Sequence, residues 1–281
     1  MKVLKKWTGI LFVMPSLIGV MIFYIIPFIS SLGYCFTRGI VERKFVGLHN
    51  FMSLFQSKAY RLAIGNTLSI TGVALPILCV LAVFIALLLE RQLRKYKWIQ
   101  GLLLIPMALP SASLMLLWQD LFMEQGIINE VLKSNVDWLN SEYAKAIIVL
   151  LIIWKNIGYS VLLIINSLLM MPKEYSEAAS LDGAGFIRQS LWIKVPYIVP
   201  VLFFTVIISL VNCFKIFREV YLLQGDYPST EIYLLQHFMN NNFNQLNYEI
   251  LSSSAFILYL IIFIIVYLIS RWQQKYISSN V

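Results

Sequence analysis

The sequence predicts an all-α integral membrane protein with six transmembrane helices. Of its 281 residues, 59% are hydrophobic and only 13% are charged, and the mean hydropathy is +0.77. A soluble domain is about 45–50% apolar and about 25% charged, so a disordered chain and an ordinary soluble enzyme are both excluded. A helix needs about 20 mainly apolar residues to cross a bilayer. Six crossings leave no room for a large soluble domain, and we expect a single transmembrane domain over residues 1–281.

Apolar runs that are almost free of charge locate the six spans. We predict them at approximately residues 8–32, 63–89, 98–119, 146–171, 196–217 and 250–270. Prolines inside four of these segments free backbone carbonyl groups, which must find other partners in a bilayer. Two interpretations follow: kinked helices within a bundle, or broken helices that line a transport path. The first run is too long for the core of a signal peptide, so we expect it to remain as a span.

The distribution of Lys and Arg predicts the orientation of the chain. With the N-terminus in the cytoplasm, the inner segments carry twelve Lys and Arg against four Asp and Glu, and the outer segments carry nine against ten. The basic segment 91–97 is the strongest single anchor. Both termini are therefore expected in the cytoplasm, with the net charge of +8 on that face. Such a face suits anionic membrane lipid, and we expect no nucleic-acid partner.

The loop at residues 172–195, between spans four and five, is the only long cytoplasmic loop that this topology predicts. Pro172 suits the first turn of a helix, and Gly183 stands where a left-handed residue would end it. A second helix is expected to end at Pro196. These features predict a helix-Gly-helix elbow, whose small residues Ala178 and Ala179 would let another backbone approach. Without further information, a simple interfacial connector explains the loop equally well.

The spacing of residues in this elbow resembles a known signature. Glu177-Ala178-Ala179, Gly183, Ile193 and Pro196 resemble the EAA pattern E-A-A-x3-G-x9-I-x-L-P of the permeases of binding-protein-dependent ABC importers, with Val195 in place of Leu. Further segments similar to permeases for sugars, oligosaccharides and glycerol phosphate are residues 45–51, Asn66-Thr67, Trp118, residues 126–129 and Trp138-Leu139. Residues 224–228 depart from the Thr-x-Gly-Gly-Pro turn that is frequent in the family.

The resemblance implies a fold, a function and partners. The fold would be that of a type I ABC importer permease in the plasma membrane of a prokaryote. The chain would translocate a sugar or oligosaccharide that an extracytoplasmic binding protein delivers, with glycerol phosphate as the alternative solute.

The elbow would be a coupling helix that docks on a cytoplasmic ATPase, present in two copies. A second permease subunit is expected to complete a heterodimer, with a homodimer as the alternative. The residues implied in coupling are Glu177, Ala178, Ala179, Asp182, Gly183, Ile193 and Pro196. Asp182 fits a plain turn and helix stop equally well.

Other functional classes find little support. The sequence has no G-x4-G-K-[ST] phosphate-binding loop, so the ATPase is expected on another chain and this chain is expected to be a transport subunit, not an enzyme. We expect no catalytic residue, cofactor or metal. An intramembrane enzyme would need a base within a span, but His49 and His237, the two histidines, fall in predicted outer loops. An ion channel or scaffold would leave the elbow spacing unexplained.

Polar residues inside the spans are candidates for the solute path, because charge within a membrane is expensive and usually functional. These candidates are Lys155, Asn156, Tyr159, Asn166 and Asn212. For Lys155 the alternatives are snorkelling or a carbonyl contact, and for the amides they are hydrogen bonds between helices. The segment 215–221 follows span five at its predicted outer end, where it would line the mouth of the path, meet the binding protein or anchor the chain at the interface.

Overall fold

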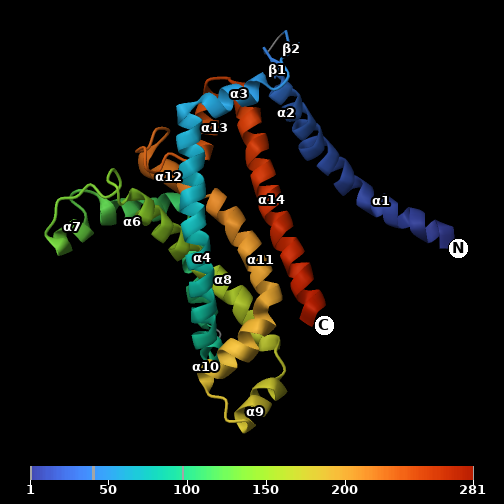
Figure 1. The fold of residues 1–281 in the computed structure, drawn as a ribbon, viewed down its shortest axis with the longest axis vertical. Helices are drawn as coiled ribbons and strands as arrows, with labels where there is room; N and C mark the ends of the chain where they lie inside the picture. The colour runs from blue at the N-terminus through green and yellow to red at the C-terminus, as the bar shows by residue number, and fades with distance from the viewer. Residues whose placement is uncertain (1, 40–41, 97, 281) are drawn as a thin grey trace. The chain divides into compact units, whose positions relative to one another are not determined.

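The computed structural model describes residues 2–39, 42–96 and 98–280 (Figure 1). The chain divides into two compact units. The first unit comprises Met1–Arg61 and Phe238–Ile262, and the second comprises Leu62–His237 and Phe263–Val281. Lys97, the last residue of the predicted basic anchor, lies outside the described residues. Both units are helical, as predicted, and one pair of two-residue strands is the only β-structure within the described ranges.

Five helical segments of the described chain are long and apolar enough to cross a membrane. They are Leu11–Phe36, Lys58–Glu90, Ala144–Met170, Phe186–Gln224 and Tyr248–Tyr276. A bent pair, Trp98–Ala108 and Ser111–Leu132, meets the same criteria when its two parts, which lie at 83° to each other, are taken together as one span. Pro110 causes the break, because its backbone is extended (φ −58°, ψ 131°) and its ring disfavours a helical conformation at the residue before it. The all-α membrane fold is confirmed, with five continuous spans and, in place of a continuous third span, this bent pair.

The first unit contains the first span and the segment after it, which folds back onto the end of that span. Its elements are α1 (Lys2–Val20), η1 (Met21–Ile25), α2 (Ile26–Phe36), β1 (Thr37–Arg38), β2 (Lys44–Phe45) and α3 (His49–Gln56). The strands pair antiparallel, with Thr37 opposite Phe45. Asn50 is buried, and its amide donates to the carbonyls of Cys35 and Thr37 at 3.0 and 2.9 Å. Gly47 has φ +57°. Residues 45–51, which helped to carry the family resemblance, therefore fold back onto the end of α2.

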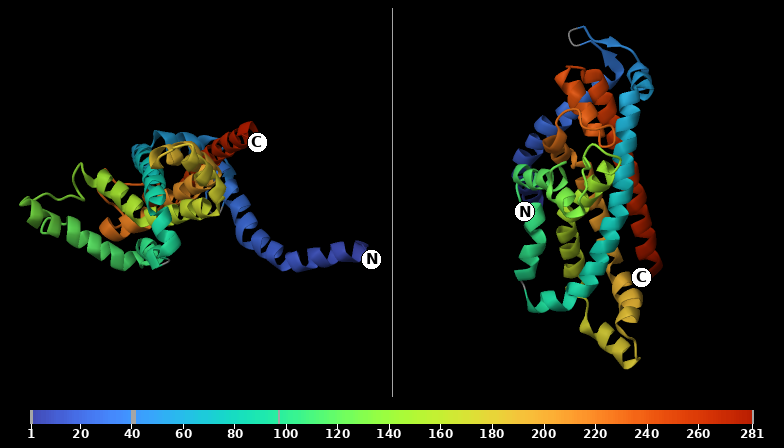
Figure 2. Two further views of the ribbon diagram at one scale, coloured as in Figure 1. Left: turned by 90° about the horizontal axis from the view of Figure 1, so that it is seen from below. Right: turned by 90° about the vertical axis from the view of Figure 1, so that its left-hand side faces the viewer.

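The second unit is built around one central helix, α8. Its elements are α5 (Trp98–Ala108), α6 (Ser111–Phe122), α7 (Ile127–Leu132), α8 (Ala144–Met170), α9 (Lys173–Leu181), α10 (Phe186–Gln189), η2 (Ser190–Lys194), α11 (Val195–Phe214) and α12 (Phe217–Gln224). Three helices, α4 (Lys58–Lys95), α13 (Leu235–Asn244) and α14 (Tyr248–Asn280), contribute to both units. Within the second unit, α8 packs against α5 and α11. In Figure 2 the colour bar lets the reader trace the chain from α5 into α6.

Two apolar clusters and one close backbone contact hold α8 in place. One cluster joins Ile148 and Ile152 to Trp118 of α6, and the other includes Ile164 of α8. The α5 backbone lies directly against Gly158, where a Cβ atom would overlap the Leu103 carbonyl. A glycine is therefore required at this crossing.

Proline does not end the helix after the elbow, contrary to the prediction for Pro196. The chain stays helical through α10, η2 and α11, with Pro196 as the second residue of α11. The π-helical segment η2 ends at Lys194, two residues before this proline, and η1 ends at Ile25, two residues before Pro27. A proline ring clashes with the carbonyl four residues earlier and cannot donate a hydrogen bond. A wider π turn at that point accommodates both problems without breaking the helix.

The segments predicted as outer loops contain ordered helices, held by buried polar side chains. The side-chain Oδ1 of Asn129 accepts a hydrogen bond from the Trp138 indole at 2.8 Å, and the side-chain amide nitrogen of Asn129 donates to the Val136 carbonyl at 2.8 Å. The amide of Asn66 donates to the Thr230 carbonyl at 2.7 Å. A Cβ on Gly126 would lie 2.8 Å from three backbone carbonyl oxygens. The polar residues that carried the resemblance outside the elbow thus organise these segments.

Candidate functional site

The elbow between α8 and α11 has the geometry that its sequence predicts. Helix α9 ends at Leu181 with Asp182 as its C-cap, and Gly183 follows in the left-handed conformation with φ +75°. The Ala184 N–H donates to the Ala179 carbonyl at 2.9 Å, and the Gly183 N–H donates to the Ser180 carbonyl at 3.1 Å. These two bonds form a Schellman motif. No atom lies within 4 Å of a Cβ built on Gly183, so the requirement for glycine is conformational and not steric.

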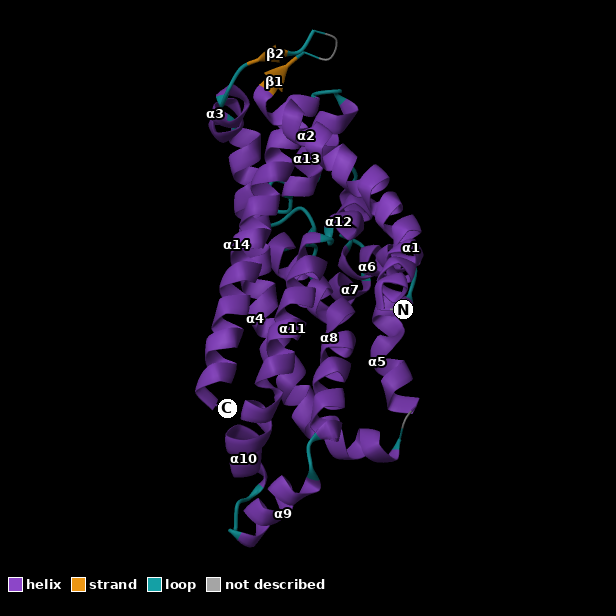
Figure 3. Cartoon of the chain, turned by 90° about the vertical axis from the view of Figure 1, so that its right-hand side faces the viewer, coloured by secondary structure: helices purple, strands orange, loops and turns teal. Residues whose placement is uncertain are grey.

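The elbow presents an exposed surface at one end of the second unit, beyond α8 and α11 (Figure 3). Glu177, Ala178 and Asp182 are exposed, whereas Ala179 is buried. The Gln189 amide donates to Ser180 Oγ at 3.0 Å and to the Ala184 carbonyl at 2.8 Å, which ties α10 to α9. Large apolar side chains are also exposed around the elbow, among them Leu181, Ile187 and Trp192. The surface combines acidic and apolar groups on a rigid turn.

Ile193 and Pro196 lie beyond the turn, in the continuous helix that leads into the membrane. Ile193 belongs to η2, and the next residue, Lys194, forms an ion pair with Glu90 of α4 at 2.6 Å. Both charged side chains line a groove of about 620 Å³ that Glu177 also lines. The elbow is thereby connected to two membrane helices, α4 and α11.

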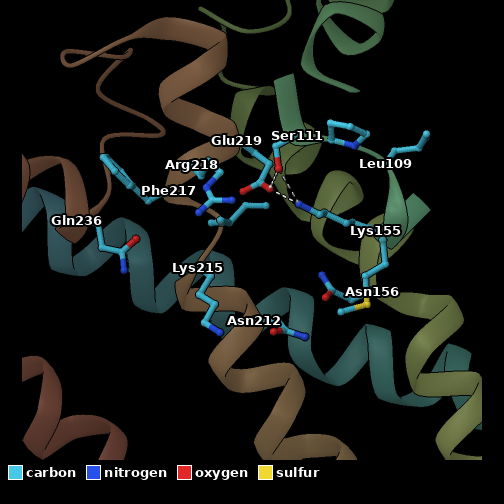
Figure 4. Close-up of a pocket in the computed structure, with 13 residues that line it drawn as sticks. Leu109, Ser111, Lys155, Asn156, Asn212, Lys215, Phe217, Arg218, Glu219 and Gln236 are labelled. Atoms are coloured by element: carbon cyan, nitrogen blue, oxygen red, sulfur yellow. Dashed lines mark hydrogen bonds and ion pairs between the residues drawn. The ribbon is translucent and has the colours of Figure 1, made fainter. Parts of the chain in front are cut away.

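A second candidate site is a polar cavity of about 680 Å³ in the same unit (Figure 4). Its walls come from the break between α5 and α6, from α8, from the junction of α11 and α12, and from the first turn of α13. The polar and charged side chains that line it are Ser111, Lys155, Asn156, Asn212, Lys215, Arg218, Glu219 and Gln236.

Lys155 forms an ion pair with Glu219 in the wall of this cavity (Figure 4). The two side chains are 18% and 5% exposed. Ser111 donates to Glu219 Oε1 at 3.0 Å, and the Lys155 ammonium contacts Ser111 Oγ at 3.3 Å. A carboxylate therefore partners Lys155, and neither snorkelling nor a carbonyl contact is needed to explain this residue. The cluster joins α6, α8 and α12, because each of the three helices supplies one side chain.

The other predicted path residues divide between the cavity and its surroundings. Asn156 lines the cavity and donates to the Ile152 carbonyl at 2.8 Å, and Asn212 lines it from α11. Tyr159 and Asn166 are not among the lining residues, and Asn166 is exposed. Sequence reasoning missed Ser111 and Gln236 as lining residues. Pro110 gives a signal for Ser111, because a helix that restarts after a proline leaves its first polar residue beside the break.

His237 lies next to the cavity residue Gln236 in sequence and is fully buried. Its Nδ1 accepts the Leu234 N–H at 3.2 Å, and its ring meets the edge of Phe217 at a centroid distance of 4.7 Å. Burial lowers the pKa of His237 from 6.5 to about 4, because desolvation disfavours the charged imidazolium. The residue is neutral at pH 7 and supports the cavity wall as a packing group.

Comparison with known proteins decides the class of this chain. Residues 78–281 match the family described as "Binding-protein-dependent transport system inner membrane component". The chain belongs to this family. The predicted membership in this family of permeases is therefore confirmed, and the chain is a membrane-embedded transport subunit and not an enzyme.

Individual members of the family and solved structures agree with this assignment. The "sn-glycerol-3-phosphate transport system permease protein UgpA" of Yersinia pestis bv. Antiqua (strain Antiqua) is 34% identical over 218 residues, 74% of each chain. The protein of the same name from Escherichia coli O6:K15:H31 (strain 536 / UPEC) is also 34% identical, over 75% of this chain and 74% of its own length. A chain of the "bacterial alginate ABC transporter in complex with alginate pentasaccharide-bound periplasmic protein" has the same fold, with a TM-score of 0.85 at 20% identity, covering 98% of this chain and 96% of that one.

Proposed function

We propose that this family member is the permease subunit of an ATP-driven importer for a sugar-type solute, and that both units act together as one permease domain over residues 1–281. The observation that carries the proposal is the exposed elbow on the same chain as a polar cavity, in a sequence without a phosphate-binding loop. The chain has a surface for an ATPase and a space for a solute, but no site of its own for ATP.

The elbow would transmit the ATPase movement. Glu177 and Ala178 are exposed on α9, and a charge-assisted contact from Glu177 to a basic ATPase residue would stabilise docking by about 1.5–3 kcal/mol. Ala179, Asp182 and Gly183 would set the shape of the turn. Ile193 and Pro196 would not contact the ATPase. They would lie at the start of the continuous helix η2–α11, which would carry the movement from the elbow toward the cavity. Helix α11 runs from the elbow to Asn212, about 25 Å at 1.5 Å per residue.

The cavity would hold the solute during its passage. Its volume falls within the range of about 300–1,000 Å³ that is typical of small-molecule sites. The amides of Asn156, Asn212 and Gln236 can both donate to and accept from sugar hydroxyls. The relatives are named for sn-glycerol 3-phosphate, and the structural neighbour for alginate, which supports a sugar-type or polyol-type solute. Tyr159 and Asn166 would contribute only in a different state of the path.

The partners follow from the division of labour among chains. We propose two copies of a cytoplasmic ATPase, an extracytoplasmic binding protein and a second, different permease subunit, in the plasma membrane of a prokaryote. Both chain termini would lie in the cytoplasm, with the elbow on the same side and with α12 and α13 on the outer side. The net charge of +8 would then face the anionic lipid of the inner leaflet.

Co-expression with a candidate ATPase, second permease and binding protein tests this function through ATP-driven uptake into proteoliposomes. Glu177→Lys should abolish uptake and co-purification of the ATPase, while membrane insertion is kept. Glu174→Lys is the matched control, because Glu174 is also an exposed acid and lies about one turn earlier on α9. Equal uptake by the two variants would overturn the coupling role, and a chain that purifies without any ATPase would overturn the importer.

A further inference from the structure

The cavity in the second unit has an unbalanced charge. Four charged side chains line it: Lys155, Lys215, Arg218 and Glu219. Glu219 is the only acid among the described lining residues, and the ion pair with Lys155 neutralises it. Lys215 and Arg218 are exposed to the cavity, and neither has an ion-pair or hydrogen-bond partner among the described residues. The lining therefore carries two uncompensated positive charges.

The backbone holds these two cations on the same wall. Lys215 caps the end of α11 and Arg218 is the second residue of α12, so they stand three positions apart across a helical junction. Ile216 between them is buried and anchors that junction. Figure 4 shows Lys215 and Arg218 on the side of the cavity opposite Lys155 and Asn156. Because this junction fixes the positions of both residues, their side chains line the same part of the cavity.

Such a wall favours anions. The guanidinium of Arg218 presents a planar fork of N–H donors that matches a phosphate or carboxylate, and Lys215 adds a compact charge beside it. Low-dielectric walls concentrate the field of a cleft lined by one sign of charge. The ion pair with Lys155 has a role here, because an unpaired Glu219 would repel an anion from the same space.

We propose that Lys215 and Arg218 form an anion subsite that receives the phosphate or carboxylate group of an acidic sugar or polyol. This inference rests on the proposed function, and it specifies the solute: the path selects acidic sugar derivatives over neutral ones. Asn212 and Gln236 lie in the same lining and are available for the hydroxyl groups of that solute.

The test measures anion binding to the purified permease–ATPase complex in nanodiscs. Inorganic phosphate and, separately, acetate are titrated at constant ionic strength, and bound anion is detected by NMR line broadening. Saturable binding is expected, and Lys215→Gln and Arg218→Gln should each raise the dissociation constant about tenfold, since each removes one charge-assisted contact. Preference for phosphate or for acetate identifies which acidic group the solute carries.

Matched controls come from α4, where Lys58 and Arg61 are exposed with the same spacing but do not line the cavity. Lys58→Gln and Arg61→Gln should leave anion binding unchanged. Non-saturable binding, or equal losses in both pairs of variants, would overturn the subsite. Uptake by the same complex separates the two proposals: uptake without saturable anion binding overturns only the subsite, whereas anion binding without ATP-driven uptake of any solute overturns the importer.

Discussion

The Lys194 ammonium lies 2.6 Å from the Glu90 carboxylate, with the two side chains only 7% and 9% exposed. The pair joins the end of α4 to the π-helical turn that leads from the elbow into α11. Desolvation offsets much of the attraction in a buried ion pair, but removal of one partner leaves a buried charge without compensation. The contact therefore fixes the position of α11 relative to α4 more than it adds net stability.

Glu90→Gln should lower the free energy of unfolding by about 3 kcal/mol, because the Lys194 ammonium stays buried without a carboxylate. The double variant Glu90→Gln/Lys194→Met should recover part of this loss, and a double-mutant cycle in detergent or nanodiscs measures the coupling. Glu231→Gln is the control, since its ion pair with Lys145, at 2.9 Å, is 42% and 36% exposed and should contribute less than about 1 kcal/mol. Equal losses in the two single variants would contradict a structural role for the buried pair.

Gly158→Ala should destabilise the second unit, because the added methyl group overlaps the Leu103 carbonyl and α5 must move away from α8. Overpacking of this kind costs about 1–3 kcal/mol, measurable as a lower thermal midpoint. Gly72→Ala on α4 is the matched control, since no atom lies within 4 Å of its added Cβ. That variant should be neutral or slightly stabilising, because alanine favours helix. A Gly158→Ala protein as stable as Gly72→Ala would show that the crossing is not close-packed.

The fold was largely predictable from the sequence, because apolar runs report directly on helices that face lipid. The effect of proline on the continuity of a helix was harder to predict. Pro110 separates α5 from α6, whereas the helix continues through Pro196, the second residue of α11, although both prolines lie in apolar segments. A π turn alone does not decide the outcome, because Pro76 and Pro200 lie inside α-helices without one. The surroundings of the carbonyl that each proline leaves unpaired also matter, and the local sequence does not show them. The helices within the predicted outer loops were missed because the side chains that hold them, such as Asn66 with its bond to Thr230, act through contacts with other parts of the chain.

The candidate sites were predictable to different extents. The turn of the elbow was predicted at the level of single residues, since a left-handed glycine after a helix has a local signature. Lys155 was identified because a charge within a span is conspicuous, but its partner Glu219 is 64 residues away and belongs to another helix. Tertiary contacts alone bring such a pair together. For the same reason, the sequence offered a place at the mouth of the path as one of three roles for segment 215–221, but it did not show that Lys215 and Arg218 share a cavity with Lys155.

Gly183→Val should impair coupling, whereas Gly183→Asn should keep most of it. Both side chains have room, because no atom lies within 4 Å of the added Cβ. Only the conformation differs: φ +75° costs a β-branched residue about 1–2 kcal/mol, while asparagine tolerates it. Uptake per complex should fall about fivefold or more with valine, at unchanged membrane levels. Equal uptake by the two variants would mean that the left-handed turn is not needed for coupling.

Acid should destabilise the protein in part through His237. Its pKa is 6.5 when unfolded and about 4 when folded, so the unfolded state binds more protons between these values. The contribution of this residue is complete above pH 6.5 and falls by about 2 kcal/mol between pH 7 and pH 5. His237→Gln should flatten the dependence of the unfolding midpoint on pH by that amount, whatever its effect at pH 7. His49→Gln, which changes the exposed histidine of α3, should keep the full slope. An unchanged slope in His237→Gln would show that the buried imidazole can be charged within the fold.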